Sequence, residues 1–146
     1  MRRTRVALFD HLVWGTWDRL PLLVGATKQR VYRSIHATCV ELGAEVVALG
    51  GVEDHVHLLV RAPATLAPAE LVKRVKGASA HLATHVVAPD HFFKWQGGYA
   101  AFSVGRGELD RLCGYIAHQE EHHRLGSLIP EWEEAPDDDA DASAKS

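Results

Sequence analysis

The sequence has 146 residues, of which 47% are hydrophobic and 24% charged, and its formal net charge at pH 7 is −3. This length suits one domain with a hydrophobic core of its own. No apolar stretch is long enough to cross a membrane, and the basic start of the chain lacks the apolar core of a signal peptide, so we expect a cytoplasmic protein with no membrane partner.

The hydrophobic pattern predicts elements in the order β-α-β-β-α-β, followed by a final helix. The predicted strands lie within residues 5–17 and at 45–51, 54–61 and 98–104, and the predicted helices at 27–42, 67–86 and 107–125. A tight turn over residues 51–53 joins the second and third strands as a hairpin. The order is ferredoxin-like, so the predicted class is α+β, with an antiparallel sheet and helices on one face.

A pair of histidines stands out in the third predicted strand. His55 and His57 are two residues apart, so both imidazoles point to one side of the strand, with Asp54 just before them. Two neutral imidazoles side by side suit a divalent metal ion. Taken alone, the pattern is also that of two half-exposed strand histidines without a ligand.

The final predicted helix, residues 107–125, carries a second pair. Tyr115 and Gln119 are four residues apart and therefore share one helix face, which is also what a polar surface stripe would show. Combined with the two histidines, they predict an active site. His55, His57 and Gln119 would hold a divalent metal, Mg²⁺ or Mn²⁺, and leave positions open for phosphate oxygens, while Tyr115 would attack the phosphorus.

Other residues are candidates for DNA contacts. Lys73, Arg74 and Lys76 form a basic cluster on the second predicted helix, which is either a phosphate-binding surface or an ordinary solvated face. Trp95, in the loop before the last strand, either stacks on unpaired bases or packs in the core.

The end of the chain differs in composition from the rest. Residues 131–146 hold seven acidic residues and one basic residue, which leaves residues 1–130 with 15 basic and 12 acidic residues, a net charge of +3. We therefore predict one domain over 1–130 and an acidic disordered tail over 131–146.

Five segments, taken in order, resemble the single-tyrosine HUH transposases of the small insertion-sequence type, the IS200-like and REP-associated tyrosine transposases. The segments are His11-Leu12-Val13-Trp14, Asp54-His55-Val56-His57, Val75-Lys76-Gly77-Ala78-Ser79-Ala80, Trp95-Gln96-Gly97-Gly98-Tyr99 and Tyr115-Ile116-Ala117-His118-Gln119. The family often has a proline where this chain has Glu53, which alters the turn and not a ligand.

The resemblance implies DNA transposition: metal-dependent cleavage of single-stranded DNA beside a hairpin, and strand transfer through a 5′-phosphotyrosine on Tyr115. It also implies a homodimer with composite sites, in which the histidines of one subunit meet the tyrosine helix of the other. The first strand, within residues 5–17, could be the sheet edge that pairs across the two-fold axis. The alternative is a host-retained protein that binds DNA hairpins without transposition activity.

Overall fold

The computed structural model describes residues 3–87 and 89–133 of the chain. Within these ranges the strands are β1 (Leu8–Gly15), β2 (Glu45–Val52), β3 (His55–Ala62) and β4 (Ala100–Val104). The α-helices are α1 (Gly25–Glu41), α2 (Pro68–Leu82), α3 (Leu109–Ala117) and α4 (Gln119–Leu125), and shorter helical turns lie at Trp17–Arg19, Ala83–Val87, Arg106–Glu108 and Pro130–Trp132. The predicted order of elements and the α+β class are confirmed.

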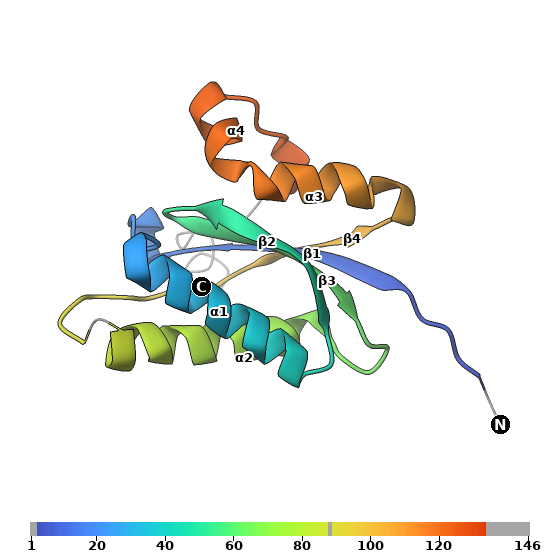
Figure 1. The fold of residues 1–146 in the computed structure, drawn as a ribbon, viewed down its shortest axis with the longest axis horizontal. Coiled ribbons are helices and arrows are strands. Elements are labelled where there is room, and N and C mark those ends of the chain that lie inside the picture. The colour runs from blue at the N-terminus through green and yellow to red at the C-terminus, as the bar shows by residue number, and fades with distance from the viewer. Residues whose placement is uncertain (1–2, 88, 134–146) are drawn as a thin grey trace, which may run out of the picture.

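The strands form one antiparallel sheet in the order β2-β3-β1-β4. Helices α1 and α2 cover one face of this sheet, and α3 and α4 lie over the other (Figure 1). The first strand is therefore not the sheet edge that sequence analysis took it for. It lies inside the sheet between β3 and β4, and the edges are β2 and β4. Pairing across a two-fold axis through β1 is excluded by this order.

Strand β3 lies between β1 and β2 and separates the two packing layers. Its even-numbered residues, Val56, Leu58 and Val60, belong to the large core shared with α1 and α2. Leu59 instead packs with residues of α3, and the ring of His57 lies against Tyr115 of that helix. The alternation predicted for this strand is confirmed, and it aims the two histidines at the layer that α3 and α4 form.

The C-terminal helix differs from the prediction. Instead of one helix over residues 107–125, two helices meet at His118, whose backbone angles (φ −114°, ψ 31°) are not helical. The ring Nδ1 of His118 donates to the carbonyl oxygen of Gly114 at 2.8 Å. The His118 backbone N–H donates to the same oxygen at 3.2 Å, so side chain and backbone share one acceptor at the break. Gly126, in the left-handed conformation (φ 67°), ends α4 as predicted.

Smaller differences concern where elements end. Helix α2 stops at Leu82 and continues as a π-helical turn, and the hairpin turn falls at residues 53–54. Strand β4 begins two residues later than predicted. The ammonium of Lys76 donates to the carbonyl oxygens of Gln96 and Gly98 at 2.6 and 3.2 Å, so those groups are satisfied without a strand partner.

Helix α3 approaches the sheet closely at Gly50 of β2. A Cβ atom at this position would overlap the carbonyl oxygen of Ile116. The strand therefore meets the helix backbone directly, which only a residue without a side chain allows.

Candidate metal and nucleophile site

The two predicted histidines of β3 are buried side by side. His55 is 3% exposed and His57 is not exposed at all. In each ring the Nδ1 atom has a partner: Nδ1 of His55 lies 2.7 Å from Asp54 Oδ1, and Nδ1 of His57 lies 2.9 Å from Nε2 of His11. These contacts fix both rings and leave both Nε2 atoms turned toward one space.

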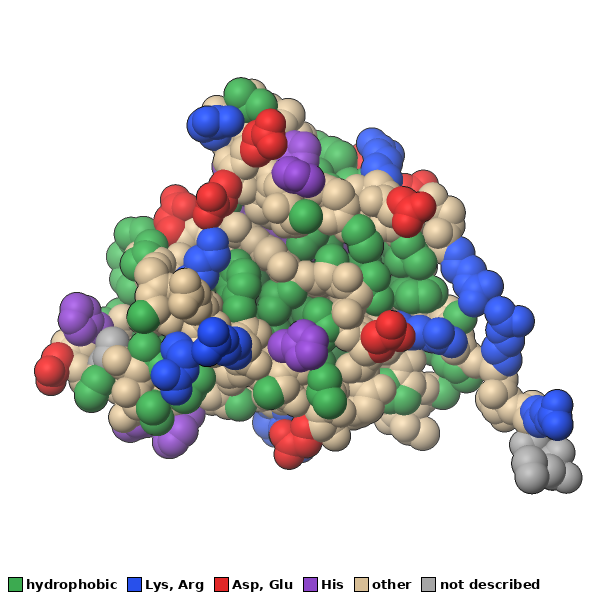
Figure 2. Space-filling view, viewed as in Figure 1, with side chains coloured by type: hydrophobic (Ala, Val, Ile, Leu, Met, Phe, Trp, Pro, Cys, Tyr) green, Lys and Arg blue, Asp and Glu red, His purple; other side chains and the backbone are tan. Residues whose placement is uncertain are grey.

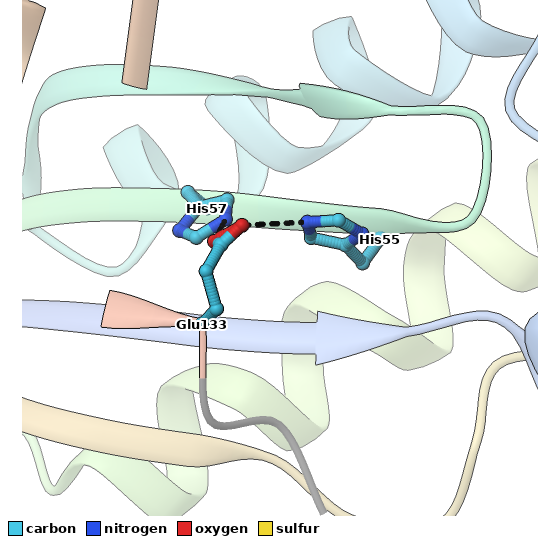
Figure 3. Close-up of side chains that lie close together, drawn as sticks. All are labelled: His55, His57 and Glu133. Atoms are coloured by element: carbon cyan, nitrogen blue, oxygen red, sulfur yellow. Dashed lines mark ion pairs between the residues drawn. The ribbon is translucent and has the colours of Figure 1, made fainter. Parts of the chain in front are cut away.

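A carboxylate that sequence analysis missed fills that space. Oε2 of Glu133 lies 2.8 Å from Nε2 of His57, and Oε1 lies 3.5 Å from Nε2 of His55. Figure 3 shows Glu133 reaching from the C-terminal segment to the two rings. One donor atom from each of these three residues lies within 4.8 Å of the other two. Two imidazoles and a carboxylate are suitable ligands for a divalent metal ion.

The ionisation of the cluster also suits a metal. Burial lowers the pKa of His57, and burial together with the neighbouring His57 lowers the pKa of His11 to about 3. The rings of His57 and His11 are therefore neutral at pH 7, as ligation by His57 requires. The pKa of His55 is instead raised, because its contacts with Asp54 and Glu133 outweigh the effect of burial. Burial alone would raise the pKa of Glu133, but its contacts with His55 and His57 hold that pKa well below its usual range. The carboxylate is ionised.

His11 of β1 was not among the predicted site residues. It is fully buried, and its ring stacks on that of His57 with centroids 5.1 Å apart. If His57 binds a metal through Nε2, its proton sits on Nδ1 and is donated to Nε2 of His11. Strand alternation alone shows that His11 lies on one face, but the register that brings it to His57 is a property of the folded sheet.

His11→Phe should weaken metal binding by about 10–100-fold, because a ring of similar shape remains while the acceptor for the His57 proton is lost. Titration calorimetry with Mn²⁺ measures the affinity. His36→Phe, at an exposed histidine on α1, is the matched control. Equal affinity in the two variants would show that His11 does not orient His57.

Tyr115 lies beside the histidine cluster of its own chain. It is 3% exposed, and its ring centroid lies 6.0 Å from that of His57. The backbone N–H of Ile129 donates to its hydroxyl oxygen at 3.1 Å. Burial raises the pKa of the Tyr115 phenol, while the Ile129 hydrogen bond and the nearby Gln119 amide act against that rise. One chain thus brings the nucleophile and the ligand candidates together, and the composite site between subunits stays a prediction.

Gln119 is the first residue of α4 and is 1% exposed. Its amide lies beside the Tyr115 hydroxyl, but neither amide atom has a well-directed hydrogen-bond partner among the described residues. The sequence predicted His55, His57 and Gln119 as the metal ligands. The cluster of donor atoms in the structure consists of His55, His57 and Glu133.

The start of the predicted acidic tail needs correction. Pro130–Trp132 forms a 3-10 turn, the Trp132 ring packs edge-on to Tyr115 with centroids 5.0 Å apart, and Glu133 joins the histidines. These residues belong to the site because tertiary contacts hold them there, which composition alone does not reveal. Residues 134–146 of the predicted tail lie outside the described residues.

The predicted DNA contacts divide into exposed and enclosed groups. Lys73 and Arg74 are exposed on α2, across the sheet from Tyr115. Lys76 binds backbone carbonyls. Trp95 is 6% exposed and its indole N–H donates to Ser79 Oγ at 3.0 Å, so it packs in the core and cannot stack on bases without unpacking. An exposed aromatic that sequence analysis overlooked is Trp17, which is 39% exposed with the Lys94 ammonium 3.9 Å from its ring centroid.

No helix among the described residues is long and apolar enough to span a bilayer.

Comparison with known proteins gives consistent matches. The family model described as "Transposase IS200 like" matches residues 5–119. The ISDra2 transposase TnpA of Deinococcus radiodurans is 30% identical over 115 residues, covering 75% of this chain and 81% of that protein. A crystal structure of a candidate transposase from Deinococcus radiodurans R1 matches with a TM-score of 0.65 and 27% identity, over 82% of this chain and 98% of the other. The REP-associated tyrosine transposase bound to a REP hairpin has a similar fold, with a TM-score of 0.63 at 14% identity, over 88% and 74% of the two chains.

Proposed function

This chain belongs to the IS200-like transposase family, and on that premise we propose that it cleaves and rejoins single-stranded DNA with Tyr115 as nucleophile and a divalent metal, Mg²⁺ or Mn²⁺, held by His55 and His57. One observation carries the proposal: the Tyr115 ring lies 6.0 Å from His57 within the same chain. A phenol beside two buried imidazoles provides a nucleophile next to a metal site.

In the proposed reaction the Tyr115 oxygen attacks the scissile phosphorus. A bond forms between that oxygen and phosphorus, and the bond to the 3′-oxygen of the preceding nucleotide breaks. The products are a 5′-phosphotyrosine and a free 3′-hydroxyl, and attack by a 3′-hydroxyl on the phosphotyrosine reverses the step and joins the strands. The metal supplies charge stabilisation at the phosphate oxygens when it is bound.

The chain's own groups prepare the tyrosine. A phenol is a poor nucleophile until it loses its proton, and burial makes that loss harder for Tyr115. The N–H of Ile129 and the amide of Gln119 favour the phenolate. Their contacts with the hydroxyl support a role for both in activation.

We propose Glu133 as the third metal ligand, with Gln119 as a further oxygen donor. Glu133→Gln should reduce Mn²⁺ affinity by at least the roughly 10–100-fold that loss of an outer partner costs, because it removes a charged ligand. The measurement is calorimetric titration, with Glu131→Gln as the matched control on an exposed carboxylate two residues earlier. An unchanged affinity in Glu133→Gln would indicate that Gln119, and not Glu133, is the third metal ligand.

The substrate we propose is single-stranded DNA next to a hairpin. The test is incubation of the protein with end-labelled hairpin oligonucleotides carrying single-stranded flanks, in Mg²⁺ and in Mn²⁺. A covalent protein–DNA adduct, mapped to Tyr115 by mass spectrometry, is the expected product. Tight hairpin binding with no adduct in either metal would instead support the second candidate, a host-retained hairpin-binding protein.

Mixing two inactive variants tests where the halves of each site come from. If each site is built from one chain, as we propose, His57→Ala and Tyr115→Phe remain inactive when mixed, because every chain in the mixture carries one defect. Because we propose a homodimer, exchange of subunits between the two variants is verified by the mass of the mixed dimer. Restored cleavage in a mixture with proven exchange would show composite sites and overturn the single-chain arrangement.

A further inference from the structure

The short helical turn that follows β1 lies at the end of the sheet where β3 begins (Figure 1). The backbone N–H of Thr16 donates to the carbonyl oxygen of Asp54 at 2.8 Å, and the N–H of Trp17 donates to that of Lys94 at 2.9 Å. The carboxylate of Asp54 lies 2.7 Å from Nδ1 of His55, one of the two predicted metal ligands. The turn is therefore fixed beside the metal site.

Two residues of this turn have an unfavourable backbone conformation. Asp18 (φ 52°) and Arg19 (φ 54°) are both left-handed, and no other residue except glycine has a positive φ in the described part of the chain. Such conformations are costly for residues with a side chain, and they cluster at functional sites. The turn they form presents Trp17, which is 39% exposed, and the side chain of Arg19, which is 42% exposed.

The exposed indole of Trp17 lies among cations. The Lys94 ammonium is 3.9 Å from the centre of the ring, and the Arg19 guanidinium, two residues along the turn, is 4.0 Å from the Asp54 carboxylate. Hydrophobic side chains reach the surface at this end of the molecule, on the left of Figure 2. A flat apolar ring with positive charge beside it suits a single nucleic-acid strand, because a base stacks on the ring while cations contact the phosphates.

We propose that Trp17 stacks on an unpaired base of the DNA strand that enters the metal site, with Lys94 and Arg19 on the neighbouring phosphates. The bases of a duplex are stacked on one another, so this contact selects for a single strand. Every base has a flat face, so the contact adds affinity without reading the sequence. The inference rests on the proposed function and adds to it a surface that holds the strand beside the metal site.

The test is binding of fluorescein-labelled DNA hairpins, with and without single-stranded oligo-dT flanks, measured by anisotropy in EDTA so that no cleavage occurs. Trp17→Leu keeps an apolar side chain in the turn but has no flat face. It should bind the flanked hairpin about tenfold more weakly than wild-type protein, the effect of losing one stacked base, and the blunt hairpin equally well. Trp17→Tyr keeps a ring and should retain most of the affinity. Equal binding of the flanked hairpin by Trp17→Leu and wild-type protein overturns the proposal.

Two further variants locate the effect. Phe92, an aromatic residue that is 58% exposed in the loop before β4, is the matched control, and Phe92→Leu should bind as wild-type protein does. Equal losses in Phe92→Leu and Trp17→Leu would overturn a specific contact at Trp17. Lys94→Ala should lower the slope of log affinity against log salt by about 0.7, the value of one phosphate contact on a single strand. Trp17→Leu should leave that slope unchanged, and an unchanged slope in Lys94→Ala overturns its phosphate contact.

These binding measurements separate the inference from the chemistry. If wild-type protein forms no adduct in Mg²⁺ or Mn²⁺ but Trp17→Leu loses affinity for the flanked hairpin, the strand contact stands and the strand-transfer proposal fails. If adducts form and Trp17→Leu binds as wild-type protein does, the strand contact fails and strand transfer stands. Equal affinity of wild-type protein for flanked and blunt hairpins also overturns the strand contact.

Discussion

Tyr115→Phe should abolish the covalent protein–DNA adduct while leaving hairpin binding nearly unchanged. The substitution removes one oxygen and keeps the ring, which stacks on His122 with centroids 4.6 Å apart and packs against Trp132. The loss is the nucleophile itself together with one hydrogen bond from Ile129, so the chemical step has no substitute group. Denaturing gels with labelled DNA and Mn²⁺ detect the adduct, and mobility shifts measure binding.

The matched control for that experiment is Tyr99→Phe, which removes a phenol oxygen from a residue packed against the main core. It should form the adduct at the wild-type rate. An adduct that persists in Tyr115→Phe would mean that another tyrosine is the nucleophile, and peptide mapping would identify it.

His57→Ala should lower metal-dependent cleavage by about 10²–10³-fold, the effect of losing a main source of transition-state charge stabilisation. His57 is fully buried between His11 and Glu133. Binding of DNA should be largely kept, because phosphate contacts provide most of the affinity. Single-turnover cleavage in Mn²⁺ gives the rate.

His36→Ala, at an exposed histidine of α1, is the control for His57→Ala and should cleave normally. Thermal unfolding of both variants shows whether removal of a buried ring has also destabilised the fold. A folded His57→Ala protein that cleaves at the wild-type rate would contradict the metal site.

The parts of the site that lie within one element could be predicted from the sequence. Strand alternation placed His55 and His57 on one face, because side chains alternate in any strand. The predicted helix contained Tyr115 and Gln119, and both lie where helical structure is found. The prediction of one continuous helix was wrong, because the His118 side chain hydrogen-bonds to the Gly114 carbonyl and competes there with the backbone hydrogen bond of the helix. The spacing of apolar residues carries no signal of this competition.

The parts that depend on tertiary contacts could not be predicted. Glu133 lies in an acid-rich stretch whose composition indicates disorder, and only its contact with the histidines reveals its position. His11 meets His57 through the register of β1 against β3. Trp95 is an aromatic in a loop by sequence, yet its hydrogen bond to Ser79 and its burial make it part of the core.

Through Gly50, the sheet helps to set the distance between the Tyr115 nucleophile and the histidines of β3. The helix residue that contacts Gly50 is Ile116, one position after Tyr115. The backbone of α3 therefore lies directly against the strand, with no side chain between them. An added methyl group would act as a spacer and lift the nucleophile away from the histidines. A displacement of about 1 Å can cost on the order of 10²-fold in rate. Gly50 carries no functional group and does not contact the nucleophile hydroxyl, yet its lack of a side chain sets the distance between Tyr115 and the histidines. Variants at this glycine should therefore show a reduced rate of cleavage.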